Sequence, residues 1–240
     1  MADLGAAHKR RLREIWRSAG WPCHDALELE LLAAGLLTRH WDAEGRETLR
    51  VSEAGITLLA AARQRNQAAF GAHEALVRRV ATEMQRAGRI VWRALSLRAP
   101  LPAEDGATRW ATAMPDVYSI RHTTVEDYVE PIVHEIKVSR ADLLSDLRSR
   151  TKGPAYLAMG SQCWYVLREG IAAPDEVPEA FGVMLAGDDG LEVARAAPRR
   201  PMRLPFAVWM ALARAQAEPL MEGDDQAWLG GAAAAPDGAP

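Results

Sequence analysis

The sequence predicts an α/β protein in which a mixed central sheet is flanked by helices, preceded by a small α+β domain. Two observations predict this class. The first is a set of short runs rich in β-branched and apolar residues, typical of buried strands, at residues 89–98, 116–120, 132–138 and 162–167. The second is that helical patterns precede and interrupt these runs, in the order helix, three strands, helix, strand.

The change of pattern along the chain predicts three parts. We expect a first domain over residues 1–69 and a second over residues 70–222, since 240 residues leave room for two small cores. From Glu222 onward the sequence is acidic and then rich in Gly, Ala and Pro. Residues 223–240 are therefore expected to be a disordered tail.

The first domain is expected to begin with two helices and a hairpin. Residues 8–19 place apolar side chains at helical spacing, and Gly20-Trp21-Pro22 breaks that helix. Asp25 can cap a second helix. Two short strands around Asp42-Ala43-Glu44-Gly45 then form a hairpin, and Ser52 opens a third helix.

This order resembles a winged helix-turn-helix, and residues 35–55 are similar to the wing and following helix of many bacterial regulators. The helix that would read the major groove carries Asp25, Glu28 and Glu30 but no Arg or Lys, which argues against ordinary base readout. Arg46 in the hairpin is instead expected to contact a nucleic-acid backbone. The alternative is a solvated hairpin on a packing or dimerising domain.

The second domain is expected to begin with a helix over residues 74–87 that ends at Gly88. A strand follows, and then a long loop over residues 99–114, of a length that is often functional or mobile. After two further strands, Ser139 caps a helix. Another apolar strand and a closing pair of strands around Asp188-Asp189-Gly190 complete the domain.

The most informative segment is the strand-like run over residues 132–138. Side chains alternate across a strand, so Glu135 and Lys137 share one face while Ile136 lies on the other. A carboxylate and an ammonium fixed side by side on a buried strand are costly unless something uses them. A site that binds a divalent metal and a phosphodiester would use both of these charged groups. The alternative explanation of the pair is an internal Glu–Lys ion pair on an edge strand. Asp116 opens another strand at a plausible distance before this run.

Pro115-Asp116 followed by Glu135-Ile136-Lys137 resembles the active-site signature of the PD-(D/E)XK phosphodiesterases, the restriction-endonuclease-like nucleases. The order of elements over residues 72–200 is also the order of their core. Residues 135–142 with Lys152-Gly153 are similar to a bacterial family of inferred DNA-repair nucleases within this superfamily.

The resemblance implies that Asp116, Glu135 and Lys137 are catalytic. Mg²⁺ or Mn²⁺ would be held by Asp116, Glu135 and the Ile136 carbonyl, because these ions prefer oxygen ligands. Such a metal activates a water, and Lys137 would position that water or stabilise transition-state charge. Glu74 matches the place of a further acidic ligand in many members; the alternative is the preference of a helix N-terminus for Glu.

Basic residues beside this strand are candidate phosphate contacts. The chain is rich in arginine and uses lysine only at Lys9, Lys137 and Lys152, which favours a specific use for the last two. Arg140 and Lys152 lie on or just after the helix that follows the strand, and Arg109 lies in the long loop. For each of them the alternative is a surface charge without a partner.

Composition limits the remaining possibilities. The net charge is −3, with the acid excess in residues 171–240, so no electrostatic pattern demands nucleic acid. Cys23 and Cys163 stand far apart with no C-x-x-C motif, which argues against a disulfide framework and a structural zinc site. With no membrane-length apolar run and no signal-peptide pattern, we expect a cytoplasmic protein without a membrane partner.

The segment 203–217 is apolar nearly all round, so it is expected to be buried or to form a homodimer contact.

The leading hypothesis is therefore a magnesium-dependent DNA nuclease with a winged-helix module, acting in DNA repair or processing. The alternative, from a different class, is a catalytically inactive DNA-binding or regulatory protein that keeps a nuclease fold. The complete catalytic trio favours the first, and the acidic recognition helix weighs against the second.

Overall fold

The computed structural model describes residues 4–103 and 106–219, so the predicted tail over residues 223–240 lies outside the described residues. The chain divides into two compact units, residues 1–71 and 72–240. Each unit has its own buried apolar core among the described residues. The expected mixed sheet flanked by helices is confirmed in the second unit.

The N-terminal unit contains two helices, a hairpin and the beginning of a third helix. These elements are α1 (Ala6–Arg17), α2 (Ala26–Ala33), β1 (Leu37–Trp41), β2 (Glu47–Val51) and the first part of α3 (Glu53–Arg86). The carboxylate of Asp25 accepts a hydrogen bond from the Glu28 amide and caps α2, as the sequence predicts. The core consists of leucine and isoleucine side chains from α1, α2 and the hairpin.

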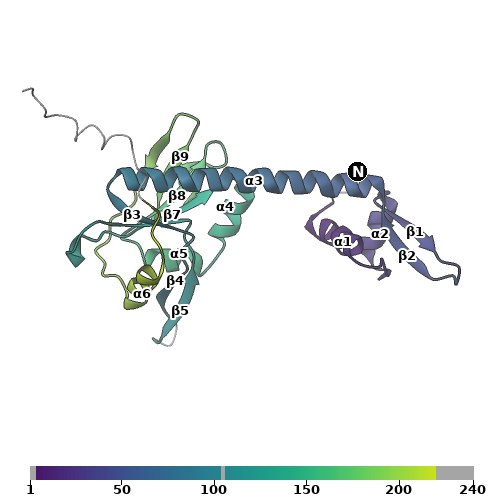
Figure 1. Cartoon of the computed structure of the whole chain (residues 1–240), viewed down its shortest axis with the longest axis horizontal. Helices are drawn as coiled ribbons and strands as arrows, with labels where there is room; N and C mark the ends of the chain where they lie inside the picture. Colours follow the sequence, from purple (N-terminus) through teal and green to yellow (C-terminus); the bar gives the residue numbers. More distant parts are fainter. Residues whose placement is uncertain (1–3, 104–105, 220–240) are drawn as a thin grey trace, which may run out of the picture. The chain divides into compact units, whose positions relative to one another are not determined.

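One long helix replaces the two that the sequence predicts on either side of Gly71. The helix α3 runs over 34 residues from Glu53 to Arg86 (Figure 1). Gly71 costs about 1 kcal/mol relative to Ala inside a helix, but it keeps its backbone N–H and therefore does not break the helix as proline would. Gly88, with φ +73°, lies just beyond the helix end, as expected.

The second unit is built on a six-stranded mixed sheet in the order β10-β9-β8-β7-β6-β3. Its strands are β3 (Arg89–Arg93), β6 (Val117–Arg121), β7 (Ile132–Lys137), β8 (Gln162–Arg168), β9 (Gly182–Ala186) and β10 (Leu191–Arg195). The pairs β7–β8 and β8–β9 are parallel, and the other three pairs are antiparallel. The strand with the predicted site, β7, is therefore central and buried on both faces.

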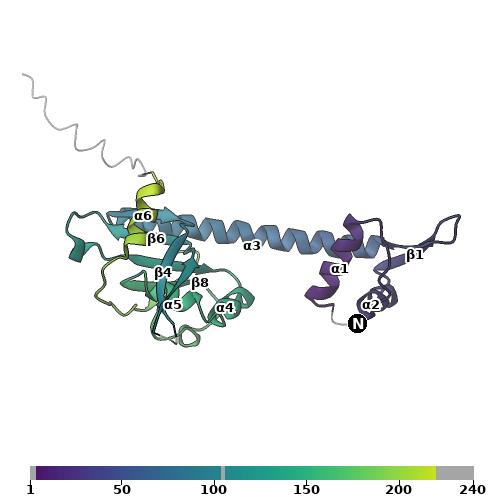
Figure 2. The same cartoon turned by 90° about the horizontal axis from the view of Figure 1, so that it is seen from below.

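Helices cover both faces of this sheet (Figures 1 and 2). On one face Leu76, Val77 and Val80 of α3 pack against Val117 and Ile136. On the other face lie the short helices α4 (Arg140–Leu147), α5 (Lys152–Leu157) and α6 (Phe206–Arg214). Two single 3₁₀ turns, η1 (Glu126–Tyr128) and η2 (Pro174–Glu176), connect the strands.

The helix expected over residues 203–217 is α6, and it is buried along one side only. Val208 and Leu212 are buried, whereas Phe206 and Met210 are exposed. No helix in the described residues is both long and apolar enough to cross a membrane.

A hairpin stands where the sequence predicts a long loop. Residues 97–102 and 108–113 form the strands β4 and β5, and that loop prediction is wrong. Pro100 and Pro102 made the segment look irregular, because proline cannot donate a ladder hydrogen bond. The Ala103 amide bonds to the Ala107 carbonyl, so by alternation both prolines occupy non-hydrogen-bonded pairs, where no donor is needed.

Candidate active site

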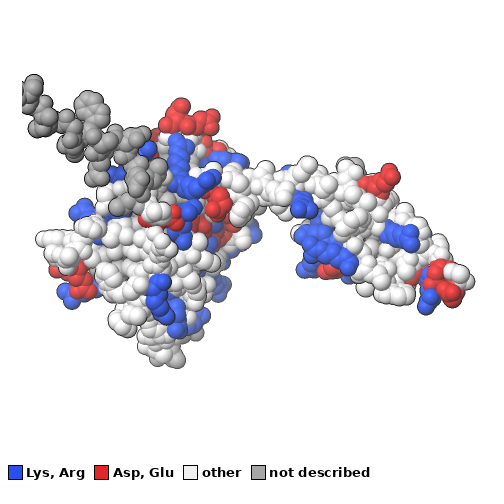
Figure 3. All heavy atoms as spheres, viewed as in Figure 1, with Lys and Arg blue, Asp and Glu red and all other residues white. Residues whose placement is uncertain are grey.

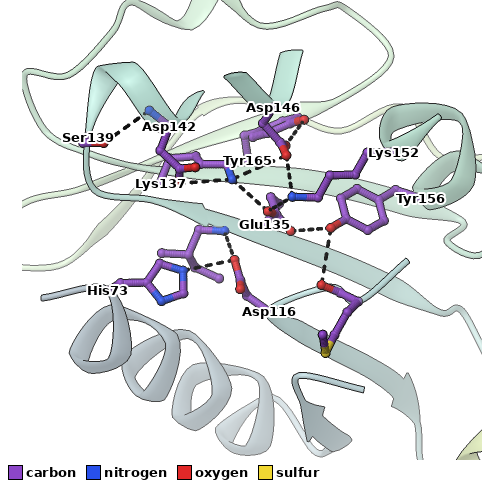
Figure 4. Close-up of polar contacts among 12 residues, drawn as sticks. His73, Asp116, Glu135, Lys137, Ser139, Asp142, Asp146, Lys152, Tyr156 and Tyr165 are labelled. Carbon is purple, nitrogen blue, oxygen red and sulfur yellow. Dashed lines mark hydrogen bonds and ion pairs between the residues drawn. The ribbon is translucent and has the colours of Figure 1, made fainter. Parts of the chain in front are cut away.

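The strand β7 places the two predicted residues Glu135 and Lys137 on one face and Ile136 on the other, as alternation requires. Glu135 and Lys137 are both buried, each about 3 % exposed. Ile136 packs on the α3 side of the sheet. The two charged side chains therefore lie on the face covered by α4 and α5, inside the protein (Figure 4).

Both carboxylate oxygens of Glu135 are held by donors. Lys137 Nζ lies 2.9 Å and Lys152 Nζ 2.6 Å from Oε1, and the Tyr156 hydroxyl donates to Oε2 at 2.6 Å (Figure 4). Two ammonium groups therefore share one oxygen of a buried carboxylate. This arrangement offsets the cost of burying Glu135 without a metal.

A second carboxylate, Asp146 of α4, faces the same two lysines. Asp146 Oδ1 forms an ion pair with Lys152 and lies 3.6 Å from Lys137 Nζ, while the Tyr165 hydroxyl donates to Oδ2 at 2.9 Å. Asp142, one helical turn earlier, approaches Lys137 at 3.3 Å. Acidic and basic groups thus alternate through the cluster.

Asp116 lies just before β6, where the ladder between β6 and β7 ends. The paired residues of this ladder end at Val117 and His134, and the Asp116 carboxylate accepts a hydrogen bond from the Ile136 amide at 2.7 Å. His73 Nε2 of α3 lies 3.4 Å from the same carboxylate oxygen. Burial and the negative charge of Glu135 raise the pKa of Asp116 to about 6.

The same buried carboxylates shift the pKa values of the neighbouring lysines and tyrosines. Burial opposes the charged ammonium, yet the charge of Glu135 raises the pKa of both Lys137 and Lys152 above the ordinary value. Burial and the Glu135 charge raise the pKa of Tyr156, and burial and Asp146 raise that of Tyr165. Both lysines are therefore cations and both phenols are neutral donors at neutral pH.

The available donors fit a hard divalent cation in type. Asp116, Glu135 and the Ile136 carbonyl supply oxygens, which Mg²⁺ and Mn²⁺ prefer. The pKa of Asp116 is raised mainly by burial and then by the negative charge of Glu135, and a bound cation would oppose both effects. In residues 4–103 and 106–219, however, no three His, Cys, Asp or Glu side chains are grouped so that they could hold a metal ion.

Glu74 is joined to this site through a histidine. It lies within α3, so the explanation that a helix N-terminus favours Glu at this position is wrong. His73 Nδ1 lies 3.6 Å from Glu74 Oε1, while its Nε2 faces Asp116. The role of Glu74 as a metal ligand stays a prediction.

The four basic residues that are predicted to contact phosphate differ in whether they are already paired with acidic groups of the protein. Arg140 makes two hydrogen bonds to the Glu176 carboxylate, at 2.9 and 2.7 Å, and Arg46 forms ion pairs with two acidic side chains of its own turn. Lys152 is occupied by the buried carboxylates described above. Arg109 is exposed on β5. Nucleic-acid binding by these four residues stays a prediction.

Sequence reasoning missed four members of the site: His73, Asp146, Tyr156 and Tyr165. Two of them carry a sequence signal in retrospect. Asp146 follows Asp142 by four residues and Tyr156 follows Lys152 by four, so each pair shares one helix face. His73 and Tyr165 carry no such signal, since their neighbours come from distant segments.

His134 also differs from expectation. Because this histidine precedes Glu135 on the strand, alternation places it on the opposite face, where a half-buried ring with satisfied polar atoms is expected. The face is correct, but the ring is fully buried, and neither ring nitrogen has a hydrogen-bond partner in the described part of the chain. Burial lowers the pKa of His134 to about 3, so the ring is neutral.

Comparison with known proteins identifies no family. No model of a protein family matches the chain, and no curated protein matches it significantly. Among solved structures, the chain is similar to the SPO1766 protein of unknown function from Silicibacter pomeroyi, with 22% identity and a TM-score of 0.39. That similarity covers 57% of this chain and 78% of the other.

Proposed function

We propose that this protein is a metal-dependent DNA nuclease with a PD-(D/E)XK-like catalytic unit, acting in DNA repair or processing. The observation that carries the proposal is that the half-buried Asp116 lies close to the buried Glu135 and Lys137 at the end of the β6–β7 ladder. A carboxyl group whose pKa is raised, as that of Asp116 is, close to a buried lysine is typical of catalytic sites.

Each residue has a separate role in this proposal. Asp116, Glu135 and the Ile136 carbonyl would hold Mg²⁺ or Mn²⁺, which when bound supplies positive charge to the phosphate and lowers the pKa of a water. Lys137 stays protonated beside Glu135 and would stabilise the negative charge that develops on the phosphate oxygens. His73 orients Asp116, and Tyr156 orients Glu135 through the hydrogen bond to Oε2.

The N-terminal unit is proposed to be a winged-helix-like module that contributes nucleic-acid binding. Its order of two helices, a hairpin and a helix supports this. Glu28, on the helix that would read bases, is buried and bonded to Arg11 and to the amides of Cys23 and His24. Its acidic charge therefore stabilises the unit and is unsuited to base readout.

A second candidate function is a non-catalytic DNA-binding or regulatory protein with the same fold. One observation favours it: Lys137, Lys152 and Tyr156 already satisfy both oxygens of Glu135. A cluster that neutralises itself needs no metal for stability.

One experiment separates the two functions. Purified protein is incubated with labelled supercoiled, linear, single-stranded and branched DNA, with Mg²⁺, with Mn²⁺ and with EDTA. Glu135→Gln is compared with Glu192→Gln, which alters an exposed glutamate on β10. A nuclease cleaves at least one substrate with metal, not with EDTA, and loses cleavage only in Glu135→Gln. DNA binding without metal-dependent cleavage of any substrate supports the non-catalytic function.

A further inference from the structure

An open groove of about 950 Å³ lies within the N-terminal unit, between α1 and the part of α3 before Gly71. Arg13, Trp16 and Arg17 line it from α1. From α3 it is lined by one stripe at helical spacing that runs from Ile56 through Arg63 to Phe70. None of the residues that line the groove comes from β1, β2 or the hairpin turn that carries Arg46.

The charge of the groove is uniformly positive. Arg13, Arg17 and Arg63 line it together with no acidic side chain. In the described residues none of these three arginines forms an ion pair, although the neighbouring Arg11 pairs with Asp25 and Glu28. Basic side chains gather over α1 in the space-filling view (Figure 3). The groove therefore complements an anion.

The same groove exposes aromatic faces. Trp16 is 58% and Phe70 68% exposed, while Asn66 and Gln67 add amide groups beside Phe70. Exposed aromatic rings beside unpaired arginines are the combination with which proteins bind unpaired bases, by stacking and by phosphate contact. Amide side chains can in addition hydrogen-bond base edges.

We propose that this groove binds single-stranded nucleic acid, with bases stacked on Trp16 and Phe70 and phosphates held by Arg13, Arg17 and Arg63. The stripe from Ile56 to Phe70 is about 21 Å long at 1.5 Å per helical residue, enough for a few nucleotides. A second copy related by a two-fold axis fits less well, because like arginines would meet in the interface. The proposal goes beyond the nuclease function and does not depend on it.

The test measures binding by the full chain in EDTA, so that cleavage does not enter. A fluorescein-labelled 15-mer of thymidine is titrated and followed by anisotropy. Trp16→Ala should weaken binding roughly tenfold, since one stacked base contributes about 1–3 kcal/mol. Trp21→Ala is the matched control, because Trp21 is 60% exposed and lies outside both the groove and the hairpin.

Two further variants distinguish stacking from phosphate contact. Trp16→Phe keeps a ring and should retain most of the affinity, whereas Arg17→Ala with Arg63→Ala should reduce the salt dependence by about 1.4 in log–log slope. Circular dichroism of each variant establishes that it is folded. An abasic 15-mer should bind more weakly than the thymidine 15-mer.

Four results would overturn the proposal. Equal affinities of the folded Trp16→Ala and Trp21→Ala variants would exclude the groove, and equal affinities for abasic and thymidine oligonucleotides would exclude stacking. If polyglutamate displaces the labelled oligonucleotide as strongly as the unlabelled oligonucleotide does, the groove would be assigned to binding an acidic protein segment. If sedimentation shows a dimer for the wild-type protein that is lost in Trp16→Ala, while the oligonucleotide affinity is unchanged, the groove would be assigned to self-association. Absence of nuclease activity would leave the binding result unaffected.

Discussion

Tyr156 donates its hydroxyl hydrogen bond to Oε2 of Glu135 at 2.6 Å, from a helix that begins fifteen residues after the strand carrying the glutamate. Both side chains are buried. The bond fixes the orientation of the carboxylate, because the two lysines contact only its other oxygen.

Replacing Tyr156 with Phe should therefore destabilise the protein. The substitution leaves Oε2 of Glu135 buried without its donor, which costs about 1–3 kcal/mol. Chemical denaturation of the full chain measures the change in the free energy of unfolding. Tyr128→Phe is the control, because Tyr128 is exposed. Equal effects of the two substitutions would show that the Tyr156 bond contributes nothing specific.

Asp116→Asn should change the pH dependence of stability in EDTA. The folded pKa of Asp116 is about 6, above its value of 3.8 in the unfolded chain. The folded state then binds the extra proton, so this group favours folding below pH 4 and that contribution disappears as the pH rises through 6. Its full size is on the order of 3 kcal/mol. The Asn variant should lose this decline in thermal melts between pH 4 and 7, while Asp188→Asn, in an exposed turn, should keep it.

His134→Leu should have the opposite effect on pH dependence. The folded pKa of His134 is about 3, below the ordinary 6.5, so wild-type stability from this group is complete above pH 6.5 and falls as the pH drops toward 3. Leucine removes that fall. It also removes two buried nitrogens that have no partner in the described residues, and should stabilise the protein by about 1 kcal/mol at pH 7. A destabilised variant with unchanged pH dependence would mean that the ring is hydrogen-bonded in solution.

Lys137→Ala should lower kcat far more than it weakens DNA binding, if the proposed nuclease function is correct. Removing one electrostatic contact to a transition state typically costs on the order of 10²–10³ in rate. Lys137→Arg should not restore the rate fully, since the guanidinium is planar and bulkier. Rates are expressed per folded molecule, and Lys9→Ala serves as control. Wild-type cleavage per folded Lys137→Ala molecule would leave only a structural role for the Glu135–Lys137 pair.

Lys152→Met should tighten divalent-cation binding, because it removes an ammonium group that lies 2.6 Å from Oε1 of Glu135. Loss of this competing charge is expected to increase Mn²⁺ affinity about tenfold by calorimetry, equivalent to 1.4 kcal/mol. Stability should fall at the same time, since Asp146 loses the closer of its two lysine partners. Weaker Mn²⁺ binding in the variant would instead mean that Lys152 positions Glu135 for the metal.

The sequence predicted those parts of the site that depend on local periodicity. Alternation along residues 132–138 was sufficient to place Glu135 beside Lys137, and their hydrogen bond agrees with it. Contacts between distant segments were not predictable in this way. Tyr165 reaches Asp146 from the neighbouring strand, and His73 reaches Asp116 from a helix. Neither contact can be inferred from the spacing of these residues in the sequence, because each depends on how the helices pack on the sheet.

The errors in secondary structure have one physical origin. Gly71 and the two prolines of residues 97–102 are poor formers of regular structure, and local propensity alone predicted a break at each. In the structure the surrounding contacts outweigh these preferences. Leu76, Val77 and Val80 anchor α3 on the sheet, and Leu97 and Ala99 bury the inner face of β4.

The prolines of β4 have a consequence for self-association. In the described part of the chain β4 pairs only with β5, so its other edge carries no paired strand. Residues in non-hydrogen-bonded pairs direct their backbone groups to that outer edge. At Pro100 and Pro102 the edge therefore has a ring in place of an N–H, and two successive donors for an added strand are missing. The hairpin is thereby protected from edge-to-edge aggregation.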